Sequence, residues 1–214
     1  MPQPAPAPQH AADGRPHRPG GVADVRRHPP QPGGRVVTVA IRPVDPAADA
    51  AVLHAWVTQD RALFWGMGDC DVERVREVYT YIDEQEHLAA YLFVVDDTPV
   101  GLLQTYDPEV DEIGRFYDRL PGDVGIHLLL SDDPARRGRT DDIIATGLAF
   151  VASLPGCARL VFEPDARNTA SLAMMERIGA VRGPLVDLRT SISQKPAQFY
   201  FLPVTSLADA PAVE

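Results

Sequence analysis

Residues 162–180 read FEPDARNTASLAMMERIGA and predict a buried strand, a short polar turn and a helix in succession. Asn168 is a favourable N-cap, and Gly179 suits the position just beyond the end of a helix. Three apolar residues recur at helical spacing between them and share one face: Leu172, Met175 and Ile178. Ligands of α/β proteins commonly bind where such a strand ends, so the polar turn is a candidate site.

The rest of the chain alternates strands and helices in a way that predicts an α/β domain. The expected order is β-α-α-β-β-β-α-β-α-β-β, in which residues 123–162 form a strand-helix-strand unit. Strands are expected at residues 35–42, 90–95, 100–106, 123–130, 159–162, 181–188 and 198–204. Helices are expected after the N-caps Asp45 and Asp71, over residues 141–152 and after Asn168. Pro184 marks the sixth strand as irregular or as an edge strand.

The helix after Asn168 resembles the GCN5-related N-acetyltransferase (GNAT) family. The residues that match the family pattern Asn-x-x-Ala-x-x-Leu-Tyr-Glu-Lys-x-Gly-Phe are Asn168, Ser171, Met174, Glu176, Arg177 and Gly179. The run EPDARN before it is similar to the siderophore branch, which acylates amines and N-hydroxyamines. The resemblance covers residues 36–204 and implies a mixed sheet of about seven strands with flanking helices, splayed between its fourth and fifth strands to admit acyl-coenzyme A. The alternative is a strand-turn-helix unit that only packs.

Composition divides the chain into three parts. Residues 1–34 contain nine prolines and five glycines but almost no large apolar side chains, which predicts a disordered extension. The acyltransferase domain is expected over residues 35–206, and residues 207–214 are expected to form a flexible tail. The low apolar content of the extension also argues against a secretory leader.

Charge and cysteine usage narrow the class of protein. The net charge of −10 argues against nucleic-acid binding, which needs a basic face. No run of 18 apolar residues exists that would span a membrane. Cys70 and Cys157 lie far apart and form no metal or redox motif, so we expect no metal and a reducing, cytoplasmic compartment. A homodimer is compatible with these observations.

By resemblance, the cosubstrate is acetyl- or succinyl-coenzyme A. Its pyrophosphate would meet the backbone N–H groups at the start of the helix near residue 141. Its pantetheine arm would pair with the edge of the strand that ends at Leu130. The residues expected to contact the cosubstrate are Leu128, Leu129, Leu130, Arg136, Arg137, Gly138, Arg139, Thr140 and Asn168. Thr140 and Asp142 stand where the family carries small residues, and Asp141 and Asp142 oppose an anion.

His127 is the catalytic candidate, together with Asp165. The histidine is isolated in the apolar run VGIHLLL, where a polar ring needs a hydrogen-bond partner or a function. One interpretation is a satisfied core histidine. The resemblance instead implies that His127 and Asp165 handle the substrate nitrogen and its proton, with Asp165 orienting the imidazole or holding the N-hydroxyl group. Met175 stands where many relatives carry a tyrosine that protonates the leaving thiolate.

The acceptor pocket is expected between the first helices, the third strand and the polar loop of residues 107–122. Its candidate residues are Phe64, Trp65, Gln104, Tyr106 and Asp107. Five acids in the loop would suit the cationic end of a diamine, although a solvated loop is an equal alternative. Residues 58–67, 105–114 and 121–127 are similar to the desferrioxamine-pathway branch of the family, which implies N-hydroxycadaverine as the acceptor. The alternatives are a lysine- or ornithine-type siderophore acyltransferase, a general amine acetyltransferase and a non-catalytic acyl-coenzyme A-binding module.

Overall fold

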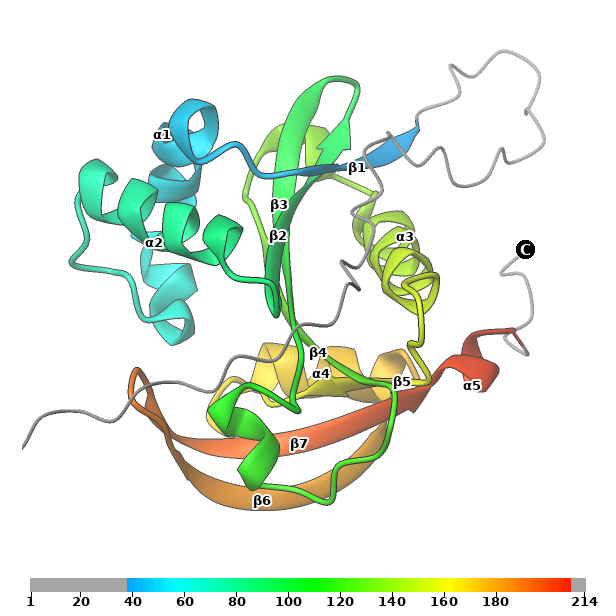
Figure 1. The fold of residues 1–214 in the computed structure, drawn as a ribbon. Coiled ribbons are helices and arrows are strands. Elements are labelled where there is room, and N and C mark those ends of the chain that lie inside the picture. Colours follow the sequence, from blue (N-terminus) through cyan, green and yellow to red (C-terminus); the bar gives the residue numbers. More distant parts are fainter. Residues whose placement is uncertain (1–37, 209–214) are drawn as a thin grey trace, which may run out of the picture.

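The computed structural model describes residues 38–208, which form one curved seven-stranded sheet with helices on both of its faces (Figure 1). The strands lie in the order β1-β2-β3-β4-β5-β7-β6. β4 and β5 pair in parallel, and the other neighbours pair antiparallel. The strands are β1 Val39–Pro43, β2 Leu88–Val95, β3 Thr98–Tyr106, β4 Asp123–Leu130, β5 Arg159–Phe162, β6 Val181–Arg189 and β7 Gln194–Pro203. The mixed seven-stranded sheet predicted from the sequence is confirmed.

The helices begin where the sequence places their caps. The carboxylates of Asp45 and Asp71 and the amide oxygen of Asn168 accept hydrogen bonds from first-turn N–H groups. Gly179 follows the end of α4 with φ of 76°, the left-handed conformation that favours glycine. The α-helices are α1 Pro46–Val57, α2 Val72–Glu84, α3 Thr140–Ala152, α4 Thr169–Arg177 and α5 Val204–Ala208. Short 3₁₀ helices are η1 Asp60–Trp65, η2 Glu112–Arg115 and η3 Pro134–Arg136.

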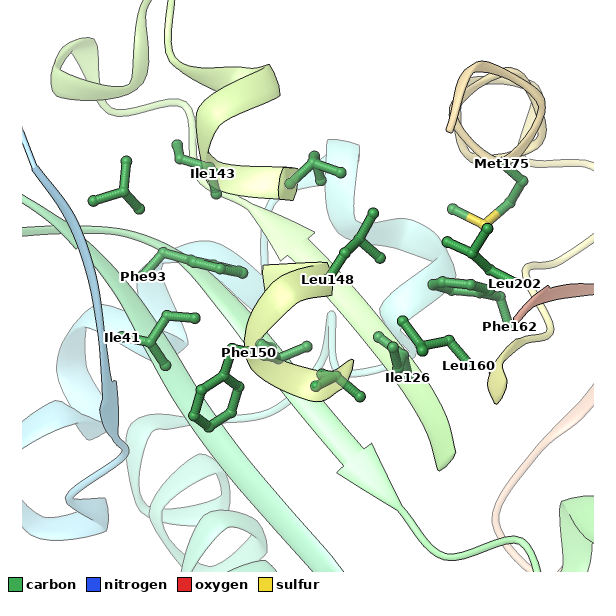
Figure 2. Close-up of a cluster of buried hydrophobic side chains, with 14 of the residues drawn as sticks. Ile41, Phe93, Ile126, Ile143, Leu148, Phe150, Leu160, Phe162, Met175 and Leu202 are labelled. Carbon is green, nitrogen blue, oxygen red and sulfur yellow. The ribbon is translucent and has the colours of Figure 1, made fainter. Parts of the chain in front are cut away.

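Two apolar layers hold the helices against the sheet. On one face α3 and α4, which contributes Met175, pack against the inward side chains of β1 to β5 and β7, among them Phe93, Ile126 and Leu160 (Figure 2). On the other face α1 and α2 cover β2 and β3 through a second cluster that includes Trp56 and Tyr79. Because side chains alternate along a strand, β2, β3 and β4 each contribute to both layers.

The fork between β4 and β5 is the feature that positions the site. The two strands pair only from Asp123 to Gly125 on β4 and from Arg159 to Val161 on β5. A partly buried ion pair closes the paired end, where Nε and Nη2 of Arg159 each lie 2.7 Å from an oxygen of Asp123. Beyond Gly125, β4 continues to Leu130 without β5 beside it, so the side of its backbone that faces β5 is open.

Several local expectations were wrong. The β2–β3 turn is shorter than expected, because Asp96 and Asp97 both adopt positive φ (46° and 66°) and Pro99 already pairs within the sheet. Residues 207–208 of the expected tail belong to α5. The polar loop of residues 107–122 is folded onto the domain and buries Ile113 and Gly114. The expected N-terminal extension lies outside the described residues.

Candidate active site

His127 and Glu163 form the centre of the site. His127 points from β4 to the α1/α2 face of the sheet, since it pairs with Gln104 and shares its face with Leu129, which packs against the α1/α2 cluster. Nε2 of the imidazole lies 2.5 Å from Oε1 of Glu163, the residue that directly follows β5. The side chain of Glu163 is completely buried, whereas that of His127 is 34% exposed. The pair therefore bridges the open end of the fork and leaves one edge of the imidazole accessible.

Glu163 remains an anion although it is buried. Burial alone would raise its pKa, but the adjacent His127 imidazole, the Lys195 ammonium and the Tyr106 hydroxyl together lower it to about 2. The Tyr106 hydroxyl donates to Oε2 of Glu163 at 2.8 Å, and burial beside this carboxylate raises the tyrosine pKa well above its ordinary value. An ionised carboxylate only accepts hydrogen bonds, so Nε2 of His127 carries the hydrogen that lies between the two groups.

This assignment leaves Nδ1 of His127 as the nitrogen with a lone pair in the neutral ring. No other described residue forms a hydrogen bond with His127. The ring lies between two aromatic side chains, Tyr106 at a centroid distance of 5.2 Å and Trp65 at 6.3 Å in an edge-on arrangement. The imidazole is thus held by a carboxylate at Nε2 and contacted by two aromatic rings, and Nδ1 is free for a substrate.

Gly125 makes this arrangement possible. A Cβ on Gly125 would lie within 1.9–2.2 Å of ring atoms of Tyr106. The glycine therefore provides the space in which the tyrosine ring lies across β4 and delivers its hydroxyl to Glu163.

Asp165 forms no hydrogen bond with His127, whose imidazole bonds to Glu163 instead, so Asp165 does not orient the ring; that it holds the N-hydroxyl group stays a prediction. Its carboxylate accepts two hydrogen bonds from the Arg167 guanidinium, at 2.6 and 2.8 Å, and one from the Arg167 backbone N–H. These bonds hold the pKa of Asp165 below its ordinary value. The physical reason is the register of the fork: Gly125 pairs with Val161, so two residues further along His127 faces Glu163. Asp165 instead lines the neighbouring pocket.

The residues expected to hold coenzyme A are arranged along the open side of the fork. Leu128, Leu129 and Leu130 continue β4 beyond its pairing with β5, so their backbone can pair with an extended amide chain. Asn168 acts as a cap, with its side-chain oxygen accepting from the Ser171 N–H at 3.1 Å. That Asn168 also contacts the cosubstrate stays a prediction.

The turn before α3 contains the residues that were expected to bind the pyrophosphate. Arg136 donates to the Ser131 carbonyl and to the Thr140 hydroxyl, while Gly138 adopts a φ of 71° that lets the chain enter the helix. No side chain caps the first N–H groups of α3, so they remain free for a phosphate. The residues that line this turn are Arg136, Arg137, Gly138, Arg139 and Thr140.

The two acids at the start of α3 are paired. Asp141 lies 2.8 Å from Arg177 of α4, and Asp142 lies 3.7 Å from Arg139. Their opposition to an anion is therefore reduced, and Arg137 is exposed without an ion-pair partner among residues 38–208.

The acceptor residues fall into two groups. Trp65, Gln104 and Tyr106 lie next to His127. Phe64 lines a pocket of about 420 Å³ beside them, whose walls come from η1, the turn after β5 and the start of β7. Asp107 is exposed and its carboxylate accepts from the Glu109 N–H within its own loop, so it does not reach this pocket.

Sequence reasoning missed Glu163 and Lys195. Glu163 belongs to the quoted run at residues 162–168, and strand alternation from Val161 would have placed it on the His127 face. Lys195 lies 3.5 Å from the Glu163 carboxylate, and no local pattern marks it.

The profile of the acetyltransferase (GNAT) domain family matches residues 45–188, which include the fork, the His127 strand and α4. The chain belongs to this family. The GNAT domain is accordingly an N-acyltransferase, and the fold agrees with the aminoglycoside acetyltransferase AAC(6')-Ib crystallised in complex with coenzyme A. That structure is 20% identical, covers 80% of this chain and 98% of its own, and has a TM-score of 0.67.

Curated relatives of this chain include three enzymes named for the acylation of lysine, N6-hydroxylysine and N-hydroxyputrescine. The lysine N-acyltransferase MbtK of Mycobacterium sp. (strain MCS) is 27% identical over 194 residues, which are 89% of this chain and 78% of the relative. The N(6)-hydroxylysine O-acetyltransferase of Escherichia coli is 27% identical over 72% of this chain and 52% of its own length. The N-hydroxyputrescine acetyltransferase of Acinetobacter baumannii is 26% identical over 66% of each. The chain thus spans between about half and four fifths of these relatives.

Among the described residues no helix is long and apolar enough to cross a membrane.

Proposed function

We propose that the protein acylates an N-hydroxylated aliphatic diamine, N-hydroxycadaverine, with acetyl- or succinyl-coenzyme A in hydroxamate siderophore biosynthesis. The observation that carries this proposal is the His127–Glu163 pair at the mouth of the β4–β5 fork, which supplies a fixed base beside an open strand edge. The relatives named for lysine, N6-hydroxylysine and N-hydroxyputrescine support an amine or N-hydroxyamine acceptor. A pure acyl-coenzyme A-binding module would need no such base.

The reaction is a direct transfer. The substrate nitrogen attacks the thioester carbonyl carbon with its lone pair, the carbonyl electrons move to oxygen, and a backbone N–H of β4 stabilises the oxyanion. The nitrogen proton passes to Nδ1 of His127, while Nε2–H stays hydrogen-bonded to the Glu163 anion, which stabilises the imidazolium that forms. Collapse of the intermediate breaks the C–S bond, and the coenzyme A thiolate then takes up the proton from the imidazolium.

An N-hydroxyamine suits this site because its nitrogen needs little assistance from a base before it attacks. Its nitrogen is less basic than that of an alkylamine, so it is already largely neutral near pH 7 and able to attack. Met175, which stands where relatives carry a tyrosine acid, is buried in the core and supplies no proton. The imidazolium formed at His127 is then the proton source for the leaving thiolate.

A second candidate is a lysine-type acceptor. Arg167 and Lys195 line the 420 Å³ pocket beside His127, and cations favour a substrate that carries a carboxylate. The expected acidic environment for a diamine is weaker than the sequence implied, because Asp107 turns to its own loop.

A free-thiol release assay tests the function. Acetyl- and succinyl-coenzyme A are each paired with N-hydroxycadaverine, cadaverine and N6-hydroxylysine. We expect turnover to depend on the N-hydroxyl group, with N-hydroxycadaverine the best acceptor. Equal rates on cadaverine would reject the N-hydroxyamine preference, and the absence of thiol release with every pair would reject the acyltransferase assignment to these substrates.

A further inference from the structure

The pocket of about 420 Å³ beside the reaction centre combines two cations with an apolar wall. It is lined by Leu63, Phe64 and Gly66, by Asp165 and Arg167, and by Ser193, Gln194 and Lys195. Phe64 and Trp65 are consecutive residues of η1, and Trp65 packs against the His127 ring, so the pocket adjoins the imidazole.

Lys195 is the unusual member of the pocket. It is the only lysine in the sequence, in which the other 19 basic residues are arginines. Its ammonium lies 3.5 Å from Oε1 of Glu163, outside the range of a good hydrogen bond. That oxygen already receives the short bond from His127, and Oε2 receives the Tyr106 hydroxyl. An ammonium carries three N–H donors, and none has a hydrogen-bond acceptor among the described residues.

The side chain of Lys195 is only 20% exposed, so water does not surround these donors freely. A partly buried cation whose donors are unfilled favours an anion as its partner. Lysine also fits this position better than arginine, because its compact charge can serve Glu163 on one side and a ligand on the other.

Arg167 adds a second cation to the lining of the pocket. Asp165 holds Nε and Nη2 of the guanidinium, and the group lies over the Phe64 ring at 5.9 Å. Nη1 is not used by Asp165 and remains available as a donor.

The apolar wall defines the rest of the ligand. Leu63 is 73% exposed and Phe64 39% exposed, although both are large hydrophobic side chains. Together they cover one side of the pocket with a surface suited to a short chain of methylene groups.

We propose that this pocket is a carboxylate subsite that selects a substrate with a short aliphatic chain ending in a carboxylate, held by the Lys195 ammonium. The inference rests on the proposed acyl transfer and deepens it. The carboxylate has two possible sources: the far end of a succinyl group on the donor, or the α-carboxylate of an amino-acid acceptor. We expect the ammonium end of a plain diamine to be disfavoured in the subsite, because the Lys195 ammonium repels it.

Two matched pairs of substrates separate these sources. Succinyl- and butyryl-coenzyme A have four-carbon acyl groups and differ in the terminal carboxylate. N6-Hydroxylysine and N-hydroxycadaverine differ in the α-carboxylate. For each pair the readout is the ratio of kcat/KM between the member with the carboxylate and the member without it, in wild type, Lys195→Met, Lys195→Arg and Arg189→Met. Arg189 is a matched control because it lies on exposed β6 and pairs with Asp187 outside the pocket.

We expect one of the two ratios to fall by about tenfold in Lys195→Met, to be partly restored in Lys195→Arg, which keeps the charge but not its compact shape, and to be unchanged in Arg189→Met. The pair that responds identifies the source of the carboxylate. A ratio that stays at its wild-type value for both pairs would overturn the proposal and leave Lys195 as a counter-ion of Glu163.

Protection of Lys195 tests the subsite without turnover. Because the chain has one lysine, an amine-selective acetylating reagent followed by peptide mapping reports on Lys195 apart from the N-terminal amine. We expect a carboxylate-bearing substrate to slow labelling at least about fivefold more than its matched partner. Equal protection by both members of each pair contradicts the subsite. Selective protection without thiol release would instead keep the subsite and reject the proposed acyl transfer.

Discussion

Nε2 of His127 and Oε1 of Glu163 lie 2.5 Å apart across the point where β4 and β5 separate. The strands are held together below this point by three residue pairs and the Asp123–Arg159 ion pair, and above it only side chains connect them. The contact thus does two things at once. It places a fixed imidazole at the strand edge where an acyl thioester would lie, and it provides a buried anion that stabilises the protonated ring.

Glu163→Gln should reduce the dependence of stability on acid pH. The folded-state pKa of Glu163 is lowered to about 2, below its ordinary value of 4.5, so its ionisation stabilises the fold above about pH 4.5. This contribution, of the order of 3 kcal/mol, is lost as the pH falls from about 4.5 towards 2. Urea unfolding between pH 7 and 3 measures it. We expect the free energy of unfolding to fall less steeply in Glu163→Gln than in wild type, and parallel pH curves would contradict the pairing.

His127→Gln should remove the base and keep the hydrogen bond to Glu163. A glutamine amide can still donate to Glu163 in place of Nε2–H, but it has no basic nitrogen. We expect turnover to fall by at least about 10²-fold, with coenzyme A affinity and the thermal midpoint close to wild type. Thiol release, calorimetric titration with coenzyme A and thermal unfolding check the three parts. Wild-type turnover in this variant would exclude His127 as the base.

Local chemistry explains which parts of this fold were predictable. Asp45, Asp71 and Asn168 mark helix starts because their side chains bond to N–H groups two or three residues away. The ends of β4 were likewise visible as an apolar run between polar residues. The hydrogen-bond partner of His127 could not be predicted from the sequence, because Glu163 and Asp165 lie two residues apart and point to the same side of the chain. Only the tertiary register, which pairs Gly125 with Val161, decides which of them meets the imidazole.

The residues that form the 420 Å³ pocket could not be grouped from the sequence either. Lys195 follows the β6–β7 turn, far in sequence from η1, and no spacing rule connects the two. α5 was also missed, since its five residues continue directly from β7 without a capping signal.

Gly125→Ala should disturb the site through Tyr106. The added methyl group would overlap the tyrosine ring, which must move and take its hydroxyl away from Glu163. We expect a loss of about 1–3 kcal/mol in stability and a larger fractional loss in turnover than in coenzyme A binding. Gly68→Ala is the control, because a Cβ there meets nothing within 4 Å and its φ is not positive. Equal behaviour of the two variants would show that Gly125 is not required for the position of Tyr106.

Arg137→Met should weaken coenzyme A binding without affecting the fold. Arg136 is tied to Ser131 and Thr140, and Arg139 lies near Asp142, so Arg137 is the cation at the start of α3 that is left for a phosphate. We expect the Kd for coenzyme A to rise about fivefold at low ionic strength, because an exposed charge beside a helix N-terminus contributes of the order of 1 kcal/mol to binding a phosphate. The effect should shrink as salt is added, since an exposed cation is screened. Calorimetric titrations at 20 and 300 mM salt, with Arg189→Met as the charge-matched control, measure the difference. A Kd that matches that of the control at both salt concentrations would show that the pyrophosphate does not bind at this turn.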